Sequence, residues 1–148
     1  MRTNVVLLPW LLDRDKLSRC VVVVFDVLRA TTTMTSALSA GVGEIRVFGD
    51  LESARLAAGE FTGEKVLCGE RKCLRPAGFD LGNSPGAFEG EAFAGKTLFM
   101  CTTNGTKAIL AAEGAGRVLV GALVNAPEVA RAVVACDRDA ILLCAGTD

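Results

Sequence analysis

The chain has 148 residues, of which 51% are hydrophobic and 22% charged, and its formal net charge at pH 7 is −1. This length suits a single domain with one core, and the hydrophobic content excludes an intrinsically disordered chain. Without an excess of positive charge, and with seven Phe and one Trp as its aromatic residues, the chain is not expected to bind nucleic acid or an acidic membrane surface.

The N-terminal segment carries a short apolar stretch, VVLLPWLL, which Pro9 interrupts and which Asp13 and Asp15 follow. It lacks a small-residue cleavage site, and no apolar run in the chain approaches the roughly 20 residues that cross a bilayer. We therefore expect an N-terminal strand and turn rather than a signal peptide, no membrane partner, and a cytoplasmic protein.

Seven β-rich runs follow one another along the chain, and several of them, such as VVVVF, TLFMC and AILLC, are apolar without alternation. Continuous apolar runs indicate strands that are buried on both faces, as in a sheet covered by helices. The expected strands cover residues 4–8, 20–26, 44–48, 65–69, 96–101, 117–121 and 139–145.

Ala-rich segments with helix signals separate these strands. Thr residues open one segment and Gly41 closes it, Asp50 precedes another as an N-cap, and Pro127 suits the first turn of the last. The expected helices cover residues 31–41, 51–61, 104–116 and 125–136. This alternation predicts one α/β domain over residues 1–148, with a parallel or mixed sheet between helices on both of its faces.

The six cysteines form no C-x-x-C pair, and the chain has no His to complete a zinc site. Cys20, Cys68, Cys101 and Cys144 lie in apolar strand-like runs, where a free cysteine behaves as a small buried hydrophobe. We expect these to be structural, and Cys73 is the candidate for an exposed thiol.

Polar residues follow five of the predicted strands at their carboxyl ends, where open α/β sheets bind ligands. The loop 70–90, rich in Gly, Pro and charge, begins at one of these ends, and a loop of that length within a compact domain is usually functional or disordered. The clusters are DVLRATTT (26–33), GER (69–71), TTNGT (102–106), Asn125 and AGTD (145–148).

These clusters suggest anion and cation binding. Asp26 follows an apolar run, where a carboxylate is costly to bury unless it is paired or binds a cation. Arg29 can pair with it or offer a bidentate fork to a phosphate or sulfonate. The N–H groups that open the following helix favour an anion, and the TTNGT turn repeats this arrangement. With no His in the chain, the oxygen ligands Asp26, Glu70 and Asp80 suit a hard cation, and we expect Mg²⁺.

Each cluster also has a purely structural interpretation. Asp26 and Arg29 can form an ion pair at a helix start, the Thr run can cap that helix, and the Asn-Gly of TTNGT is first a turn signal. The GER segment can be a solvated turn, Asp80 an Asx turn and Asn125 an N-cap. Their shared position at the strand ends favours a site over these separate roles.

Seven motifs occur in a fixed order along the chain: DVLRATTT (26–33), ALSAG (37–41), GER (69–71), GFDLGNSP (78–85), TTNGT (102–106), Asn125 and CAGTD (144–148). In this combination the chain resembles the 2-phosphosulfolactate phosphatases, the ComB-like proteins of coenzyme M biosynthesis. The resemblance implies a three-layer α/β/α fold with a mixed sheet. It also implies Mg²⁺-dependent hydrolysis of 2-phosphosulfolactate to sulfolactate and phosphate.

The motifs and the resemblance together name the candidate site. Asp26, Arg29, Glu70 and Arg71 are expected to carry the chemistry, with Asp26, Glu70 and Asp80 as Mg²⁺ ligands. The expected substrate is a small phosphorylated sulfonate, or a phosphorylated carboxylate if the physiological ester differs. The residues expected to bind it are Thr31, Thr32, Asn83, Ser84, Thr102, Thr103, Asn104, Gly105, Thr106 and Asn125.

One departure from the family concerns length, because family members continue well beyond the AGT segment and this chain ends at Asp148. We therefore expect a domain that is truncated at its C-terminal end and covers the N-terminal three-fifths of such a protein. A truncated sheet with this hydrophobic content favours self-association, so a homo-oligomer is among the expected states.

Alternatives remain open for the mechanism and for the function. Hydrolysis can proceed by water attack on a metal-bound phosphate or through an aspartyl-phosphate on Asp26. The Asp-x-Asp pattern of haloacid-dehalogenase-type phosphatases fails here, because Leu28 stands two residues after Asp26, and this favours a metal-binding or positioning role. A nucleotide-dependent transferase or oxidoreductase is disfavoured, since no G-x-G-x-x-G follows the first strand and no G-x-x-x-x-G-K-[ST] motif occurs. The other alternative is a non-catalytic fragment that binds small anions.

Overall fold

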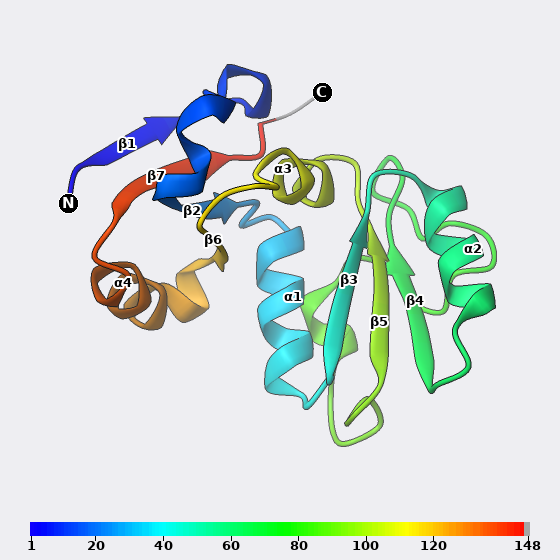
Figure 1. Cartoon of the computed structure of the whole chain (residues 1–148). Helices are drawn as coiled ribbons and strands as arrows, with labels where there is room; N and C mark the ends of the chain where they lie inside the picture. Colours follow the sequence, from blue (N-terminus) through cyan, green and yellow to red (C-terminus); the bar gives the residue numbers. More distant parts are fainter. Residues whose placement is uncertain (147–148) are drawn as a thin grey trace.

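The computed structural model describes residues 1–146, in which seven strands are separated by helices (Figure 1). The strands are β1 (Thr3–Val6), β2 (Cys20–Phe25), β3 (Glu44–Phe48), β4 (Lys65–Gly69), β5 (Thr97–Cys101), β6 (Arg117–Gly121) and β7 (Asp139–Cys144). The α-helices are α1 (Ala30–Ser39), α2 (Leu51–Glu60), α3 (Gly105–Ala111) and α4 (Ala126–Ala135). Short 3-10 helices are η1 (Pro9–Leu11), η2 (Arg14–Arg19), η3 (Pro85–Ala87) and η4 (Leu123–Asn125).

The predicted strands and helices are confirmed, mostly with shifts of one or two residues at their ends. The largest error concerns the helix predicted over residues 104–116, because α3 ends at Ala111. Gly114 has a φ of +89°, in the left-handed region that ends helices, so the GAG segment belongs to the turn that leads into β6.

The strands form two parallel sheets, where a single sheet was expected. Sheet A has the order β1-β7-β2-β6 and sheet B the order β3-β5-β4. Helix α1 stands between them (Figure 1). Met34 and Ala37 of α1 pack with Leu98 and Met100 of β5, and Val120 of β6 lies against the same cluster. The α/β class, with parallel strands flanked by helices, is confirmed.

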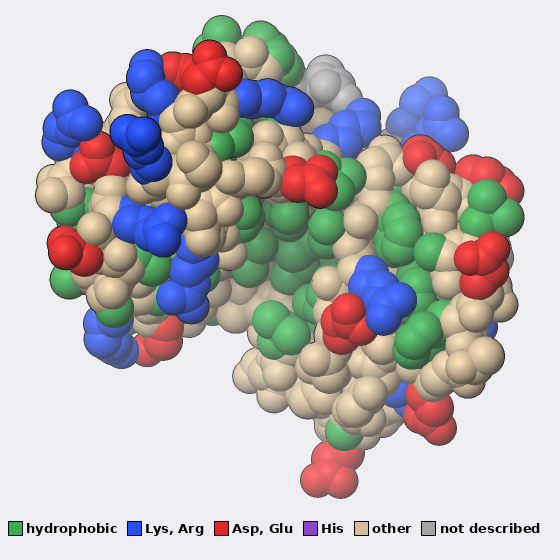
Figure 2. Space-filling model, in the orientation of Figure 1, with side chains coloured by type: hydrophobic (Ala, Val, Ile, Leu, Met, Phe, Trp, Pro, Cys, Tyr) green, Lys and Arg blue, Asp and Glu red, His purple; other side chains and the backbone are tan. Residues whose placement is uncertain are grey.

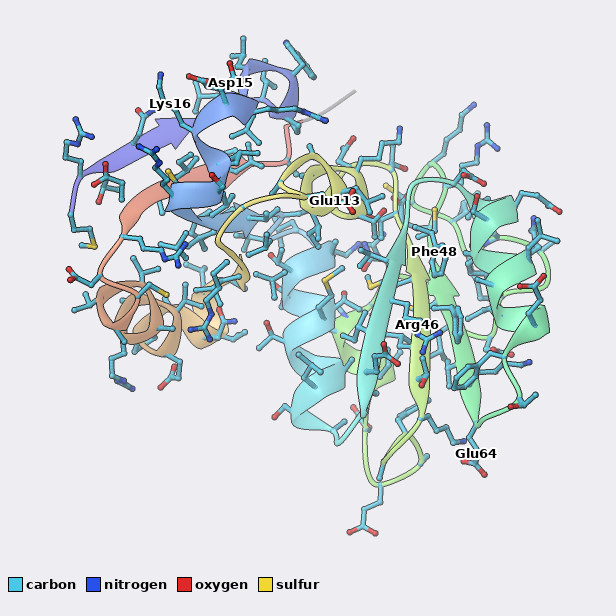
Figure 3. All side chains as sticks on the ribbon, in the orientation of Figure 1. Asp15, Lys16, Arg46, Phe48, Glu64 and Glu113 are labelled. Atoms are coloured by element: carbon cyan, nitrogen blue, oxygen red, sulfur yellow. The ribbon has the colours of Figure 1, made fainter. Side chains whose placement is uncertain are left out.

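Strand β5 is buried on both faces, as its continuous apolar run indicated. Leu98 belongs to the cluster that packs around α1. On the opposite face, the ring centroids of Phe99 and Phe48 are 5.8 Å apart, and the Arg46 guanidinium carbon lies 5.0 Å from the ring centroid of Phe61 (Figure 3). Helix α2 covers this second face, so sheet B is the middle layer of an α/β/α sandwich.

Strand β2 is an inner strand of sheet A, and its four valines are fully buried. Val22 and Val24 pack with Leu17 and with Ala108 of α3 on one face. Val23, on the other face, lines an apolar pocket under α4, a helix without buried residues. Figure 2 shows hydrophobic side chains gathered in the hollow between the two halves of the molecule. Sheet A is therefore covered less completely on its α4 side.

Parallel pairing places all strand ends of one sheet at the same edge. Helix α1 begins just after β2 of sheet A, α3 begins just after β5 of sheet B, and the two helices contact each other. The carboxyl ends of β2, β4 and β5 therefore meet, although they belong to different sheets. Within residues 1–146, no helix has the length and apolar character needed to span a membrane.

Candidate active site

A pocket of about 630 Å³ lies where the two sheets present their carboxyl ends. It brings together seven of the residues expected from sequence, drawn from the turn after β2, the loop after β4 and the turn after β5. Four further residues that were not expected in the site also line it. The lining residues are Asp26, Leu28, Arg29, Glu70, Arg71, Lys72, Cys73, Asn83, Thr103, Asn104 and Lys107.

Asp26 is fixed by the turn that joins β2 to α1. Its backbone N–H donates to Oγ1 of Thr31 at 3.2 Å, and its carbonyl accepts the N–H of Thr31 at 3.0 Å. The hydroxyl of Thr32 donates to the carbonyl of Val27 at 2.7 Å. Neither Thr31 nor Thr32 lines the pocket, so both side chains shape the turn in this structure, and any contact they make with substrate stays a prediction.

The Asp26 carboxylate lies against Gly105 at the start of α3. A Cβ at position 105 would be 2.5 Å from Oδ2 of Asp26 and would also collide with the Ala30 methyl, so the close approach requires glycine. Burial raises the pKa of Asp26, and the backbone N–H groups of Ala30, Gly105 and Arg29 oppose this by favouring its charged form. The N–H groups at the starts of α1 and α3 thus face a carboxylate of the protein itself.

Glu70 joins the ends of β4 and β5. It is 9% exposed, its Oε1 accepts the N–H of Thr103 at 2.7 Å, and its Oε2 accepts the N–H of Cys73 at 2.8 Å. Burial alone would raise the pKa of Glu70, but the hydrogen bonds from Thr103 and Cys73 and the charge of Arg29 outweigh it, so the pKa is lowered. Glu70 is therefore a fixed negative charge beneath the pocket.

A tight hairpin follows Glu70. Arg71 and Leu74 exchange backbone hydrogen bonds of 3.0 and 3.1 Å, and between them Lys72 and Cys73 have φ values of +53° and +63°. Two consecutive residues of this conformation match the hairpin turn that usually contains Asn and Gly. Non-glycine residues rarely adopt it, and such strain concentrates at functional sites. The hairpin places Arg71, Lys72 and Cys73 on the pocket wall.

Asn83 reaches the pocket from the middle of the loop 70–90. Its side chain is 4% exposed, and its Oδ1 has no hydrogen-bond partner among the described residues. A buried amide oxygen without a partner costs about 1–3 kcal/mol. Such an atom beside a polar pocket indicates a ligand that supplies a donor or a cation.

The structure keeps two predicted residues of the same loop away from the pocket. The Oδ2 atom of Asp80 accepts the N–H of Leu67 at 2.8 Å, next to β4 and apart from Asp26 and Glu70. Ser84 is exposed and precedes η3. The three carboxylates expected to bind Mg²⁺ are therefore not gathered, because Asp80 is engaged with the backbone of β4.

Thr102, Thr106 and Asn125, also expected to bind substrate, have structural partners. Each of the two threonines accepts the other's backbone N–H through its side-chain oxygen at 3.0 Å, and both are buried. Asn125 accepts the N–H of Ala122 at 2.8 Å and donates to Oγ1 of Thr35 at 3.2 Å, so it ties the turn after β6 to α1. Substrate contacts of these three residues remain predictions that the described geometry does not favour.

Asp26, Glu70, Asn83 and Asn104 line the pocket with side chains whose oxygens suit a hard cation. Within residues 1–146, no three His, Cys, Asp or Glu side chains converge on one point. Mg²⁺ is commonly bound through one or two carboxylates while it keeps waters and contacts a substrate phosphate. The donor set of the pocket thus fits Mg²⁺ without Asp80.

Four lining residues, Leu28, Lys72, Cys73 and Lys107, were not predicted to belong to the site. Two of them follow from patterns in the sequence. Lys72 directly follows the GER motif, and Lys107 stands three residues after Asn104, on the same side of a helix. Cys73 is exposed as expected, and Cys20, Cys68 and Cys101 are buried.

Comparison with known proteins agrees with this arrangement. The sequence model of the 2-phosphosulpholactate phosphatase family matches residues 6–148. A protein of Deinococcus radiodurans is 45% identical over 150 aligned positions, which cover 100% of this chain and 60% of that protein. A protein of Clostridium novyi is 37% identical over 137 positions, covering 93% of this chain and 58% of the relative.

Both relatives are named probable 2-phosphosulfolactate phosphatase, as is a protein of a Synechococcus strain that is 47% identical over 114 positions, or 76% of this chain and 47% of its own length. The chain thus spans less than two thirds of the length of these relatives. The family match covers nearly the whole chain and includes every residue that lines the pocket. The chain belongs to the 2-phosphosulpholactate phosphatase family.

Proposed function

We propose that the protein hydrolyses the phosphate ester of a small acid, with 2-phosphosulfolactate as the substrate and sulfolactate and phosphate as the products. The relatives carry this activity in their names. The observation that carries the proposal is that two carboxylates, Asp26 and Glu70, line one pocket together with Arg29 and Arg71. Carboxylates suit a cation and arginines suit the oxygens of phosphate, so one pocket offers both kinds of partner.

In this proposal Asp26, Glu70 and the unpartnered oxygen of Asn83 would hold Mg²⁺. The ion would supply positive charge that offsets the negative charge of the phosphoryl oxygens. Arg29 and the amide of Asn104 orient the phosphoryl group from the turns after β2 and β5. A water oxygen forms a bond to phosphorus as the ester P–O bond breaks, and the proton that the water loses is balanced by the proton that the leaving alkoxide takes up.

Water is the proposed nucleophile, and Asp26 a positioning group and ligand. Its carboxylate is seated between the starts of α1 and α3, against Gly105, with backbone N–H groups from three residues directed at it. A carboxylate confined in this way suits a fixed ligand or positioning role better than attack on phosphorus, for which its oxygen must approach the target atom. An Asp26 nucleophile would leave a phosphoryl-enzyme that trapping during turnover can detect.

The direct test is phosphate release from synthetic 2-phosphosulfolactate by the purified protein, with Mg²⁺ and with excess chelator. We expect turnover that the chelator abolishes and that added Mg²⁺ restores. Hydrolysis that continues unchanged in chelator would contradict the proposed role of the metal. The absence of any phosphate release with Mg²⁺ would contradict the proposed phosphatase function.

A second candidate function is binding of small anions without turnover, which the cationic residues Arg29, Arg71 and Lys72 of the pocket would support. Calorimetry with sulfolactate and with inorganic phosphate separates the two functions. Binding of both without hydrolysis of the ester supports the second candidate.

We further propose a cytoplasmic location and self-association. Support for association comes from large apolar side chains at the surface, including Leu123 at 81% exposure and Val124 and Val134 at 65%. Light scattering at several protein concentrations tests the oligomeric state.

A further inference from the structure

A second, smaller pocket adjoins the candidate active site. It measures about 270 Å³ and lies at the carboxyl ends of β3 and β5, near the start of α2. Its lining residues are Gly49, Asp50, Leu51, Glu70, Arg71, Cys101, Thr102, Thr103 and Lys107. Four of them, Glu70, Arg71, Thr103 and Lys107, also line the larger pocket, so the two spaces share a wall and one ligand can reach both.

Arg71 stands at this junction, and its backbone position is strictly defined. Glu70 accepts the N–H of Cys73 at 2.8 Å, and Arg71 and Leu74 exchange two backbone hydrogen bonds. The left-handed conformations of Lys72 and Cys73 cost free energy and persist only where the surrounding structure determines them. The hairpin therefore has a fixed shape that holds one arginine at the boundary of two pockets.

The charges around the junction favour an anion. No ion pair between described residues involves Arg29, Arg71 or Lys72, although all three line the larger pocket. Besides Glu70, the carboxylate that lines the smaller pocket is Asp50, and both of its oxygens are bonded to Ser53 at 2.8 and 2.7 Å. The carboxylate of Asp50 is thus engaged as the N-cap of α2, and it repels an anion in the smaller pocket less than a carboxylate without these hydrogen bonds would.

The two arginines come from different sheets. Arg29 follows β2 beside Asp26 and does not line the smaller pocket, whereas Arg71 follows β4 and lines both. A phosphate held near Asp26 and Arg29 would leave Arg71 available to a different part of the substrate. We propose that Arg71 determines specificity by binding, in the smaller pocket, a second acid group of the substrate, a carboxylate or a sulfonate. This proposal rests on the proposed phosphatase function and assigns the task of one residue within it.

The test compares two phosphate esters, 2-phosphosulfolactate and glycerol 2-phosphate. In glycerol 2-phosphate, two uncharged hydroxymethyl groups replace the carboxylate and the sulfomethyl group of 2-phosphosulfolactate. In Arg71→Met we expect kcat/KM for 2-phosphosulfolactate to fall at least about tenfold relative to kcat/KM for glycerol 2-phosphate. This fall should come mainly from a higher KM for 2-phosphosulfolactate. Arg71→Lys should restore part of the ratio between the two kcat/KM values. The matched control is Lys72→Met, which removes a positive charge from the same hairpin outside the smaller pocket and should preserve the ratio.

An equal loss of kcat/KM for both esters in Arg71→Met would assign Arg71 to the phosphate and overturn the proposal. Unchanged kcat/KM values for both esters would overturn it as well. If neither ester is hydrolysed by the unaltered protein, the phosphatase function fails separately. The role of Arg71 is then decided by calorimetry, where Arg71→Met should weaken sulfolactate binding at least about tenfold while the binding of inorganic phosphate persists. Parallel loss of both ligands, or no sulfolactate binding by the unaltered protein, overturns it.

Discussion

The two carboxylates of the pocket follow strands of different sheets, and the protein shifts their pKa values in opposite directions. Asp26 follows β2 of sheet A, where burial raises its pKa against the pull of three backbone N–H groups. Glu70 follows β4 of sheet B, where hydrogen bonds from Thr103 and Cys73 overcome burial and lower its pKa. One carboxylate is thus held charged at a cost to folding, and the other stabilises the fold by its charge.

This difference suggests a division of tasks. A group that the fold tolerates only at a cost is expected to act on a ligand, because the backbone N–H groups around it offset its burial only in part. A group whose two oxygens connect strand ends and a hairpin is expected to place its neighbours, whether or not it also contacts a cation. The comparison predicts that Asp26 matters more for turnover and Glu70 more for stability.

The largest expected effect concerns turnover of 2-phosphosulfolactate. Asp26→Asn removes the carboxylate charge that the proposed Mg²⁺ site requires, and we expect kcat/KM to fall by about 10²–10³-fold. The exposed Glu64, before β4 at the opposite end of sheet B, provides the control Glu64→Gln, which should stay within about twofold of the unaltered protein. Asp26→Asn activity within tenfold of the original would end the proposed role of Asp26.

The second effect tests the seat of Asp26 without changing its charge. In Gly105→Ala the new methyl meets Oδ2 of Asp26 and the Ala30 side chain, so we expect a loss of about 1–3 kcal/mol in the free energy of unfolding and a clear loss of activity. Gly59→Ala in α2 is the matched control, because its Cβ would meet nothing within 4 Å, and it should stabilise the protein by about 0.5–1 kcal/mol. Urea unfolding measures both. Equal stability of the two variants would show that Asp26 is not confined by Gly105.

How far the sequence predicts this arrangement depends on the range of the interactions. Apolar runs gave the seven strands, because burial on both faces leaves a pattern within each segment. The same segments predicted Asp26, Arg29, Glu70 and Arg71 at strand ends, and all four line one pocket. Local sequence did not predict the separation into two sheets, since this depends on how α1 packs between β6 and β5.

Several residues predicted to bind a ligand have partners within the fold, and for these residues ligand binding stays a prediction. Asp80 has the right chemistry for a metal ligand, but its Oδ2 atom accepts the backbone N–H of Leu67 in β4, 13 residues away in sequence, at 2.8 Å. Thr102 and Thr106 bond to each other, and Asn125 bonds to Thr35, 90 residues away in sequence. A polar residue in a motif does not reveal whether its partner is a ligand or another residue of the chain.

The third effect is on stability and has opposite signs at the two carboxylates in metal-free buffer. At a pH above the ordinary pKa of a Glu side chain, the lowered pKa of Glu70 stabilises the folded state. This contribution is lost as the pH falls through the lowered pKa. The raised pKa of Asp26 acts in reverse, so stability present at low pH is lost as the pH rises through the raised pKa. At pH 7 Glu70→Gln should lower the Tm and Asp26→Asn should raise it by a few degrees.

Thermal unfolding at pH 7 and at a pH below the lowered pKa of Glu70 measures this difference. Both effects should shrink in acid, where the carboxylates of the unaltered protein become protonated in the folded and unfolded states. Adding Mg²⁺ should raise the Tm of the unaltered protein more than that of Asp26→Asn. Shifts of the same sign for the two variants at pH 7 would contradict the contrast between the carboxylates.

The smallest effect concerns thiol reactivity at the hairpin that Glu70 holds. Cys73 is exposed and lines the larger pocket, whereas Cys68 is buried in β4 and its burial raises the pKa of the thiol to about 12. Since the thiolate is the reactive form, a disulfide reagent at pH 8 should modify Cys73 first and Cys68 only on unfolding. Inorganic phosphate should slow the reaction at Cys73 by filling the pocket beside it. Loss of the fast phase in Cys73→Ser identifies the thiol, and a fast phase that phosphate leaves unchanged would separate the hairpin from the anion site.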